Sequence, residues 1–243
     1  MKRKLLVIIL ATIFMCGCSN NTENQINSLM QVDNIESNYI SNIQSNLNKS
    51  GVISEKAILP LYQKLYEVNN DMIGFIYLDD KYQYPILMRK DDQNYYLNHN
   101  FFGEEEKAGS IFANVHSTFA DRGISLIYGH HMRDGSMFSS LDNWKKEDYF
   151  NSHQTMQIDS LYCESTYEVV ALAIINMGDD FKYYSYVGDI SEQEFETWKL
   201  GFSPYIIRGS LDTLAYEDSI IELSTCSYER TNNRCVLILR LSQ

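Results

Sequence analysis

The chain has 243 residues, of which 44% are hydrophobic, and this is enough for one sizeable core but not for two. The 32 acidic residues outnumber the 20 basic ones, so the formal net charge is −12. The basic cluster Lys2-Arg3-Lys4 lies at the extreme N-terminus, and no second one follows. This distribution of charge argues against nucleic acid as a partner.

Residues 1–18 have the pattern of a signal or membrane-anchor segment. The basic cluster precedes an apolar run, residues 5–15, that is too short to cross a bilayer comfortably as a helix. This is the order found in a secretory signal. The next residues, Cys16-Gly17-Cys18-Ser19-Asn20, resemble a bacterial lipobox with Cys18 as the lipidated residue. A lipid on Cys18 and an uncleaved apolar helix are alternatives, and both would tether the chain to the extracytoplasmic face of the membrane.

A polar spacer is expected at residues 19–52 and a single domain at residues 53–243. The spacer is rich in Asn, Ser and Gln, and its apolar residues recur at loosely helical spacing. This predicts a marginal amphipathic helix that packs on the domain or lies near the membrane. Pro60 predicts the first turn of a helix that runs to about Asn69. The expected apolar face of that helix consists of Leu61, Leu65 and Val68.

Short runs with apolar alternation predict seven strands after this helix. They are residues 72–78, 84–88, 109–115, 124–128, 168–176, 219–225 and 235–241. Helical turns are expected near residues 94–97 and 136–141. A longer helix begins at Ser191, where Ser191 and Glu194 form a capping box, and stops near Gly201. Many strands, few helices and no regular alternation of the two predict a closed, mostly antiparallel barrel with helical insertions.

A cysteine, Cys226, directly follows the strand at residues 219–225. A thiol is a good nucleophile only as thiolate, and a cationic neighbour favours that form. Arg230 and Arg234 follow, and Arg234 stands at the head of the last strand, so a thiol and a guanidinium are expected at the same end of two adjacent strands. The chain also offers a base, because His130 and His131 follow another strand, after Gly129. Adjacent residues of an extended segment diverge, so only one of these histidines is expected to face Cys226.

Four segments in this order resemble a class B sortase, a member of the cysteine transpeptidases that attach proteins to the Gram-positive cell wall. They are Asn94-Tyr95-Tyr96-Leu97-Asn98-His99-Asn100-Phe101, Lys107-Ala108-Gly109-Ser110-Ile111-Phe112, Tyr128-Gly129-His130-His131-Met132 with Gly135-Ser136-Met137-Phe138, and Leu223-Ser224-Thr225-Cys226 with a downstream arginine. The resemblance covers roughly Leu59 to the C-terminus. It implies a mostly β (α+β) fold, a closed eight-stranded β-barrel with N-terminal helices and a helix inserted between the sixth and seventh strands.

The resemblance also implies catalytic roles. Cys226 would attack the carbonyl of a Thr in a sorting signal, through a tetrahedral oxyanion, to give a thioacyl-enzyme that an amine resolves. His130, directly after Gly129, would be the acid and base, and His131 would be structural or solvent-facing. Arg234 would stabilise the oxyanion and orient the substrate backbone, with Arg230 as the alternative.

The substrate groove is predicted from the same resemblance. Ser224 stands at the position whose hydroxyl faces the threonine of the signal, or it is an inert strand serine. Leu97 stands at the position of an apolar wall residue, and Gln93 occupies the place of an expected Asn. Tyr183 and Tyr184 either line the rest of the groove or are ordinary core and surface tyrosines.

Two other cysteines are given structural interpretations. A Cys226–Cys235 disulfide is the alternative to a reactive thiol, but strand alternation turns Cys235 away if Arg234 faces Cys226. Cys163 is expected to be a small buried residue. The adjacent histidines and Cys226 do not have the spacing of a zinc site, so no metal and no cofactor is expected.

The N-terminal segment and the resemblance to class B sortases together imply an N-terminally tethered, extracytoplasmic cysteine transpeptidase. It would cleave a C-terminal sorting signal of the Asn/Ser-Pro-x-Thr kind on exported proteins and transfer them to a peptidoglycan-precursor or pilin amine. A hydrolytic cysteine peptidase is one alternative, because the choice of acceptor depends on groove shape and water exclusion, which residue types do not determine. A non-catalytic surface lipoprotein that uses the barrel as a binding module is the other.

Overall fold

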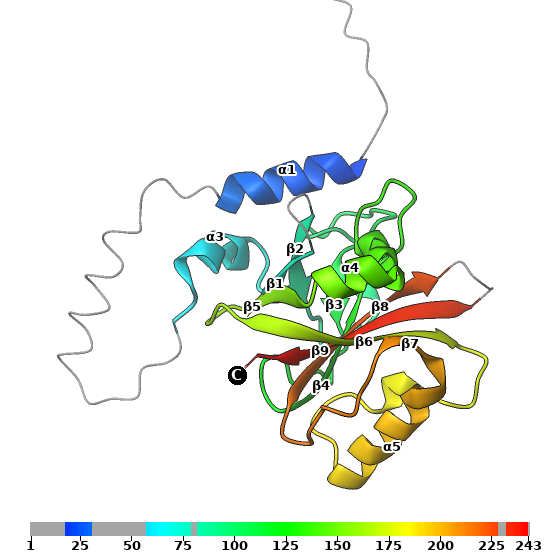
Figure 1. Cartoon of the computed structure of the whole chain (residues 1–243). Coiled ribbons are helices and arrows are strands. Elements are labelled where there is room, and N and C mark those ends of the chain that lie inside the picture. Colours follow the sequence, from blue (N-terminus) through cyan, green and yellow to red (C-terminus); the bar gives the residue numbers. More distant parts are fainter. Residues whose placement is uncertain (1–17, 31–56, 79–81, 228–231, 243) are drawn as a thin grey trace, which may run out of the picture.

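The computed structural model describes residues 18–30, 57–78, 82–227 and 232–242, and a nine-stranded sheet forms the centre of this part of the chain (Figure 1). The strands are β1 (Met72–Tyr77), β2 (Gln83–Leu87), β3 (Ile111–Ala113), β4 (Gly123–Tyr128), β5 (Thr155–Ser160), β6 (Thr166–Asn176), β7 (Ile206–Gly209), β8 (Ser219–Ser227) and β9 (Asn233–Leu241). All seven strands that the sequence predicts are present, with ends that differ by a few residues.

Eight of these strands close into a barrel in the order β5-β1-β2-β3-β4-β8-β9-β6, because β6 pairs with β5 as well as with β9. β7 pairs with a different stretch of β6 and extends the sheet beyond the barrel. Neighbouring strands are antiparallel except in the β2–β3 and β4–β8 pairs. Parallel neighbours need long crossover connections, and here those connections carry helical insertions. The predicted closed, mostly antiparallel barrel is confirmed.

The sequence interpretation missed β5 and β7. In β5, apolar Met156 and Ile158 alternate with polar Gln157 and Asp159, but Asp159 is buried with them, so the face pattern is broken. β7 has only four residues and lies at the outer edge of the sheet, where its alternating half-buried and exposed residues give little apolar signal.

Helices cover parts of the outer surface of this barrel. They are α1 (Cys18–Met30), α3 (Pro60–Val68), α4 (Glu147–Ser152) and α5 (Glu192–Phe202), with single-turn or short 3-10 helices η1 (Tyr95–Leu97), η2 (Phe138–Lys145), η3 (Tyr183–Ser185) and η4 (Ser203–Tyr205). α5 follows β6, the sixth strand, as expected, and Ser191 and Glu194 form its capping box. α4 was not predicted.

The predicted apolar face of α3 is partly wrong. The helix begins at Pro60, but its buried residues are Tyr62 and Leu65, whereas Val68 is 49% exposed. Tyr62 and Leu65 are three residues apart and therefore share one face of the helix. Val68 ends the helix, and Asn69 after it is already extended.

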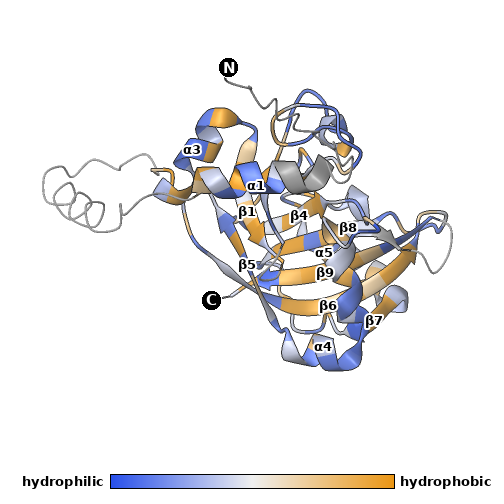
Figure 2. Ribbon diagram, turned by 90° about the horizontal axis from the view of Figure 1, so that it is seen from above, coloured by the Kyte–Doolittle hydropathy of each residue, from blue (hydrophilic) through white to orange (hydrophobic). Residues whose placement is uncertain are grey.

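Apolar residues pack into three clusters, and Figure 2 shows them concentrated in the strands. The first cluster fills the barrel interior, with Ile221, Leu223 and Leu237 from β8 and β9. The second lies on the outer face of β8 and β9, beneath α5, and includes Trp198. The third lies between the barrel and the helices α1 and α3, and includes Ile26. Strands β8 and β9 are thus buried on both faces.

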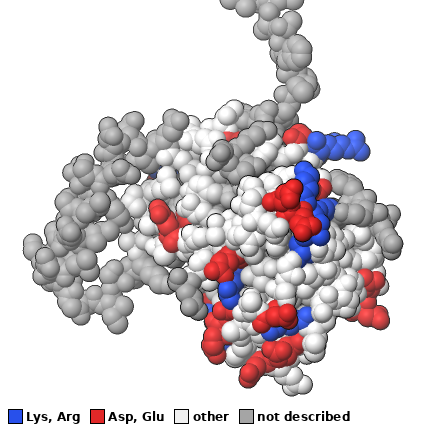
Figure 3. All heavy atoms as spheres, in the orientation of Figure 1, with Lys and Arg blue, Asp and Glu red and all other residues white. Residues whose placement is uncertain are grey.

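Acidic side chains are spread over the face that carries α4 and α5, in keeping with the negative net charge (Figure 3). Within the described ranges, none of the helices is both long and apolar enough to traverse a lipid bilayer. Of the segment predicted as a signal or anchor, residues 1–18, all but Cys18 lies outside those ranges.

Candidate active site

Strands β8 and β9 bring Cys226 and Arg234 directly opposite each other in the antiparallel register. Residues in such a pair share a face of the sheet, and their Cα atoms lie about 4.5–5.5 Å apart. The side chain of Cys226 and the whole of Arg230 lie outside the described residues. The pairing nevertheless gives Arg234 the place, across from the cysteine, that the sequence predicts for it.

A surface groove opens at this end of the two strands. It is lined by Gln93, Asn94, Leu97, Phe112, Tyr128, Gly129, His130, Met177, Tyr183, Tyr184, Ser224, Thr225 and Arg234. Every predicted site residue with a described side chain lines this groove. Five separate segments of the chain supply these site residues. The barrel thus brings together residues that lie up to 137 positions apart in the sequence (97 to 234).

His130 follows the end of β4, whose neighbour β8 runs parallel to it. The N–H of Gly129 donates to the carbonyl of Ser224 at 3.2 Å, which ties the His130 segment to β8. The Nε2 atom of His130 lies 2.7 Å from the carbonyl oxygen of Leu97. A carbonyl oxygen only accepts, so Nε2 carries a proton, and in the neutral ring Nδ1 is the atom free to take one.

The neighbouring histidine has a different environment. His131 Nε2 lies 2.8 Å from Asp142 Oδ2, and Lys145 Nζ lies 2.7 Å from Asp142 Oδ1. Burial raises the pKa of Asp142, but the bonds from Lys145 and His131 outweigh it and hold the pKa below its usual range. His131 therefore braces the segment from Phe138 to Lys145, whereas His130 lines the groove, so the two histidines diverge.

Ser224 and Tyr183 form the floor of the groove. The Ser224 Oγ and Tyr183 Oη atoms lie 2.8 Å apart, and both residues are 2% exposed. Burial raises the pKa of Tyr183, so its phenol keeps its proton. Tyr183 also packs on Phe202 of the α5 cluster, so it is a core residue and a groove residue at once. Tyr184 and Leu97 are more exposed, at 37% and 41%, and stand at the rim.

Gln93 does not project freely into the groove. Its Oε1 accepts from the Val115 N–H at 2.8 Å, and its Nε2 donates to the Ala113 carbonyl at 3.4 Å. The residue that replaces the expected Asn thus fastens the η1 segment to the end of β3. Asn94 lines the groove beside it.

The sequence interpretation missed Glu222, which lies on β8 two residues before Ser224. Glu222 is 0% exposed, and the Nε1–H of Trp198 donates to its Oε1 at 2.6 Å. Its Oε2 is buried without a partner among the described residues. Burial raises the pKa of Glu222 to about 8, although the bond from Trp198 lowers it somewhat. The pattern Ile221-Glu222-Leu223 is that of a strand with one buried face, and no local signal shows that α5 covers the other face.

The register disfavours a Cys226–Cys235 disulfide. Cys235 pairs with Thr225, is 0% exposed and belongs to the barrel-interior cluster, whereas Arg234 lines the groove. The prediction for Cys163 is wrong, because this residue is exposed. It lies in the tight turn between β5 and β6, where its backbone bonds to Ser160 and its side chain turns outward. Among the described residues, no group of three or more His, Cys, Asp or Glu is placed to hold a metal ion.

A cysteine opposite an arginine, with a histidine across a groove on a closed barrel, has the parts of a cysteine acyl-transfer site. No protein-family model matches the chain. A curated relative, sortase B of Listeria monocytogenes, is 34% identical over 179 residues, which cover 72% of this chain and 71% of the relative. The chain therefore belongs to the sortase B family and is a cysteine transpeptidase of that type.

Solved structures agree on the fold. The Staphylococcus aureus sortase B–substrate complex matches with a TM-score of 0.70 and 22% identity, over 92% of this chain and 95% of that one. A sortase B complexed with triglycine matches with a TM-score of 0.69 and 22% identity, over 92% and 96% of the two chains. The predicted eight-stranded sortase barrel is confirmed.

Proposed function

We propose that this chain is an extracytoplasmic sortase that cleaves a C-terminal sorting signal of the Asn/Ser-Pro-x-Thr kind and joins the exported protein to an amine. The observation that carries the proposal is the groove at the end of β8 and β9, where His130 and Arg234 meet the strand that bears Cys226. The substrate complex of the Staphylococcus aureus relative supports a peptide in this groove.

In the first half-reaction the Cys226 thiolate attacks the carbonyl carbon of the substrate threonine, and a C–S bond forms. The guanidinium of Arg234 faces the oxyanion that develops, and a cation fixed in place beforehand stabilises that charge in the transition state. The C–N bond then breaks, and imidazolium His130 gives its proton to the departing amine. The Leu97 carbonyl holds Nε2–H, so Nδ1 is the atom that exchanges the proton.

In the second half-reaction an amine attacks the thioester carbonyl. A new C–N bond forms, the C–S bond breaks, the thiolate is restored, and the amine gives up a proton to neutral His130. The solved sortase B with triglycine supports an acceptor with a free glycine-type amine, as in a peptidoglycan precursor. A pilin lysine is the other acceptor to be tested.

The proposed location rests on residues 1–18, a basic and then apolar segment that ends at the lipobox-like Cys18. A tether there, lipid or helix, would leave the domain at residues 53–243 outside the membrane, where exported proteins and wall precursors are found. Residues 19–52 would be the spacer, with α1 at its start.

The test incubates the full chain in detergent with a panel of sorting-signal peptides, with and without triglycine or a lysine peptide. Mass spectrometry follows the products, and Cys226→Ala is the control. An amine-dependent ligated product that is absent with Cys226→Ala is the expected result. Free acid as the sole product would favour the hydrolytic peptidase, and no thioacyl adduct with any peptide would favour the binding module.

A further inference from the structure

The segment after His130 folds back and fixes the histidine's backbone. The N–H of Phe138 donates to the carbonyl of His130 at 2.9 Å, and His131 and Met137 form an isolated antiparallel bridge. The ring of Phe138 also packs on Gly129, where an added Cβ would lie 2.7 Å from it. The position of His130 therefore depends on residues 137 and 138.

Met137 has a backbone conformation that needs support from its surroundings. Its φ is 54° and its ψ is −133°, a combination that side-chain-bearing residues rarely adopt. Such conformations persist when neighbouring contacts determine them, and they gather at functional sites. The contact here is a buried hydrogen bond, in which the Met137 N–H donates to the Tyr84 hydroxyl at 3.0 Å.

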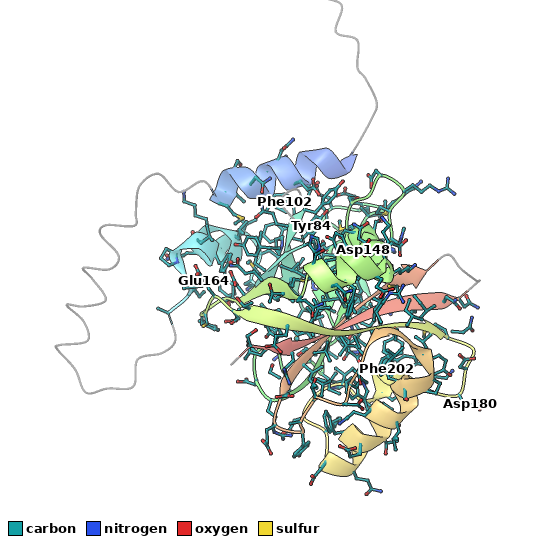
Figure 4. The ribbon with its side chains drawn as sticks, in the orientation of Figure 1. Tyr84, Phe102, Asp148, Glu164, Asp180 and Phe202 are labelled. Carbon is teal, nitrogen blue, oxygen red and sulfur yellow. The ribbon has the colours of Figure 1, made fainter. Side chains whose placement is uncertain are left out.

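The Tyr84 hydroxyl is in turn held by the N-terminal helix. It donates its proton to Glu23 Oε1 at 2.7 Å, and Tyr84 is only 4% exposed (Figure 4, where Tyr84 lies beneath α1). A phenol has one hydrogen to donate. Because that hydrogen bonds to Glu23, the hydroxyl oxygen of Tyr84 can act only as an acceptor toward the Met137 N–H. Burial and Glu23 raise the pKa of Tyr84, so it remains a donor. Bonds in such a chain polarise one another, and a bond to a carboxylate is stronger than a neutral one.

We propose that α1 is a positioning element for His130, in which Glu23 orients the Tyr84 hydroxyl and the hydroxyl holds the Met137 backbone that fixes the histidine. Glu23 and Tyr84 are positioning residues, because neither lines the groove. The expected effect on turnover rests on the proposed role of His130. The chain of hydrogen bonds from Glu23 through Tyr84 to Met137 does not depend on that role.

α1 also provides a matched control. Thr22 Oγ1 donates to Glu106 Oε2 at 3.1 Å and accepts from Asn100 Nδ2 at 3.5 Å, and neither bond reaches Tyr84. Thr22→Val removes both bonds and keeps the side-chain shape. Glu23→Ala removes the acceptor for Tyr84, whereas Glu23→Gln retains an oxygen that accepts. Tyr84→Phe keeps the ring and deletes the hydroxyl.

The experiment uses the full chain in detergent and two independent readouts. Hydrogen exchange measures protection of the Met137 amide, and peptide–triglycine ligation measures kcat and KM separately. We expect Glu23→Ala and Tyr84→Phe to speed exchange and lower kcat, each roughly tenfold, with KM unchanged. Glu23→Gln and Thr22→Val should behave like the wild type.

Two results would overturn the proposal. One is unchanged Met137 exchange in Glu23→Ala and Tyr84→Phe. The other is an equal loss of kcat in Thr22→Val, which would show that helix docking alone matters. If the wild type ligates no peptide, the proposed function fails, but the exchange measurement still decides whether Glu23 supports Met137.

Discussion

Replacing Glu222 by Gln is expected to remove a pH-dependent loss of stability that the wild-type protein carries between about pH 4.5 and pH 8. Glu222 is fully buried on the strand that carries Cys226, and its one hydrogen-bond donor among the described residues is Trp198 of α5. Gln keeps the shape and an oxygen for that donor, but it has no proton to lose. The substitution therefore isolates the cost of keeping this carboxyl protonated.

The sign and the size follow from the two pKa values. Burial raises the pKa of Glu222 from 4.5 to about 8 in the folded protein, whereas in the unfolded chain the carboxyl ionises at its ordinary value. Between these values unfolding releases a proton, so the free energy of unfolding falls by about 1.4 kcal/mol for each pH unit. From pH 5 to pH 7 the loss attributable to Glu222 is therefore about 3 kcal/mol.

Urea denaturation at pH 5, 6 and 7, followed by tryptophan fluorescence, measures this loss for the full chain and for Glu222→Gln. Other groups titrate in both proteins, so the difference between the two curves reports Glu222. Glu196→Gln, on the exposed side of α5, is the matched control and should follow the wild type. Equal pH slopes for wild type and Glu222→Gln would refute the reasoning.

Three further outcomes are expected. Tyr183→Phe should cost about 1 kcal/mol of stability and raise KM for peptide a few-fold, because it releases the Ser224 hydroxyl; unchanged KM would mean that Ser224 does not meet substrate. Gly129→Ala should lower kcat at least tenfold and destabilise the protein by about 1–3 kcal/mol, because a Cβ there would lie 2.5 Å from the Ile111 side chain and displace His130. Ligation kinetics measures the first effect and calorimetry the second. Cys18→Ala should abolish labelling by radioactive palmitate in cells, and persistent membrane association without label in the wild type would favour the helical anchor instead.

Much of the barrel was predictable because its strands have an alternating or continuous apolar pattern. The pairing of Cys226 with Arg234 also followed from sequence, since both stand where strands meet at one end of the sheet. β5 was not predicted, because its buried Asp159 breaks the alternation of apolar and polar residues. The prediction that Cys163 is buried was wrong. Cysteine is usually a buried residue type, but the tight turn in which Cys163 lies exposes its side chain.

The contacts that position the candidate site were not predictable, because they join side chains to distant backbone. No sequence pattern shows that the Leu97 carbonyl fixes the tautomer of His130. Nor does one show that the Tyr84 hydroxyl accepts a hydrogen bond from the Met137 N–H. Glu23 lies in a polar stretch, and nothing in its sequence surroundings distinguishes it from a surface glutamate. Each of these bonds depends on tertiary placement that the local pattern does not encode.

The position of the groove follows from the double burial of β8. Its inward residues, Ile221 and Leu223, fill the barrel, while Glu222 faces the cover that α5 and Trp198 provide. β8 is packed on both faces, and the groove opens at the end of the strand, where Ser224 is still covered by Tyr183. The cysteine side of the groove is thus braced by an insertion after β6. The histidine side is braced through Tyr84 by a helix that precedes the barrel, so the two supporting helices lie more than 160 positions apart in the chain (30 to 192).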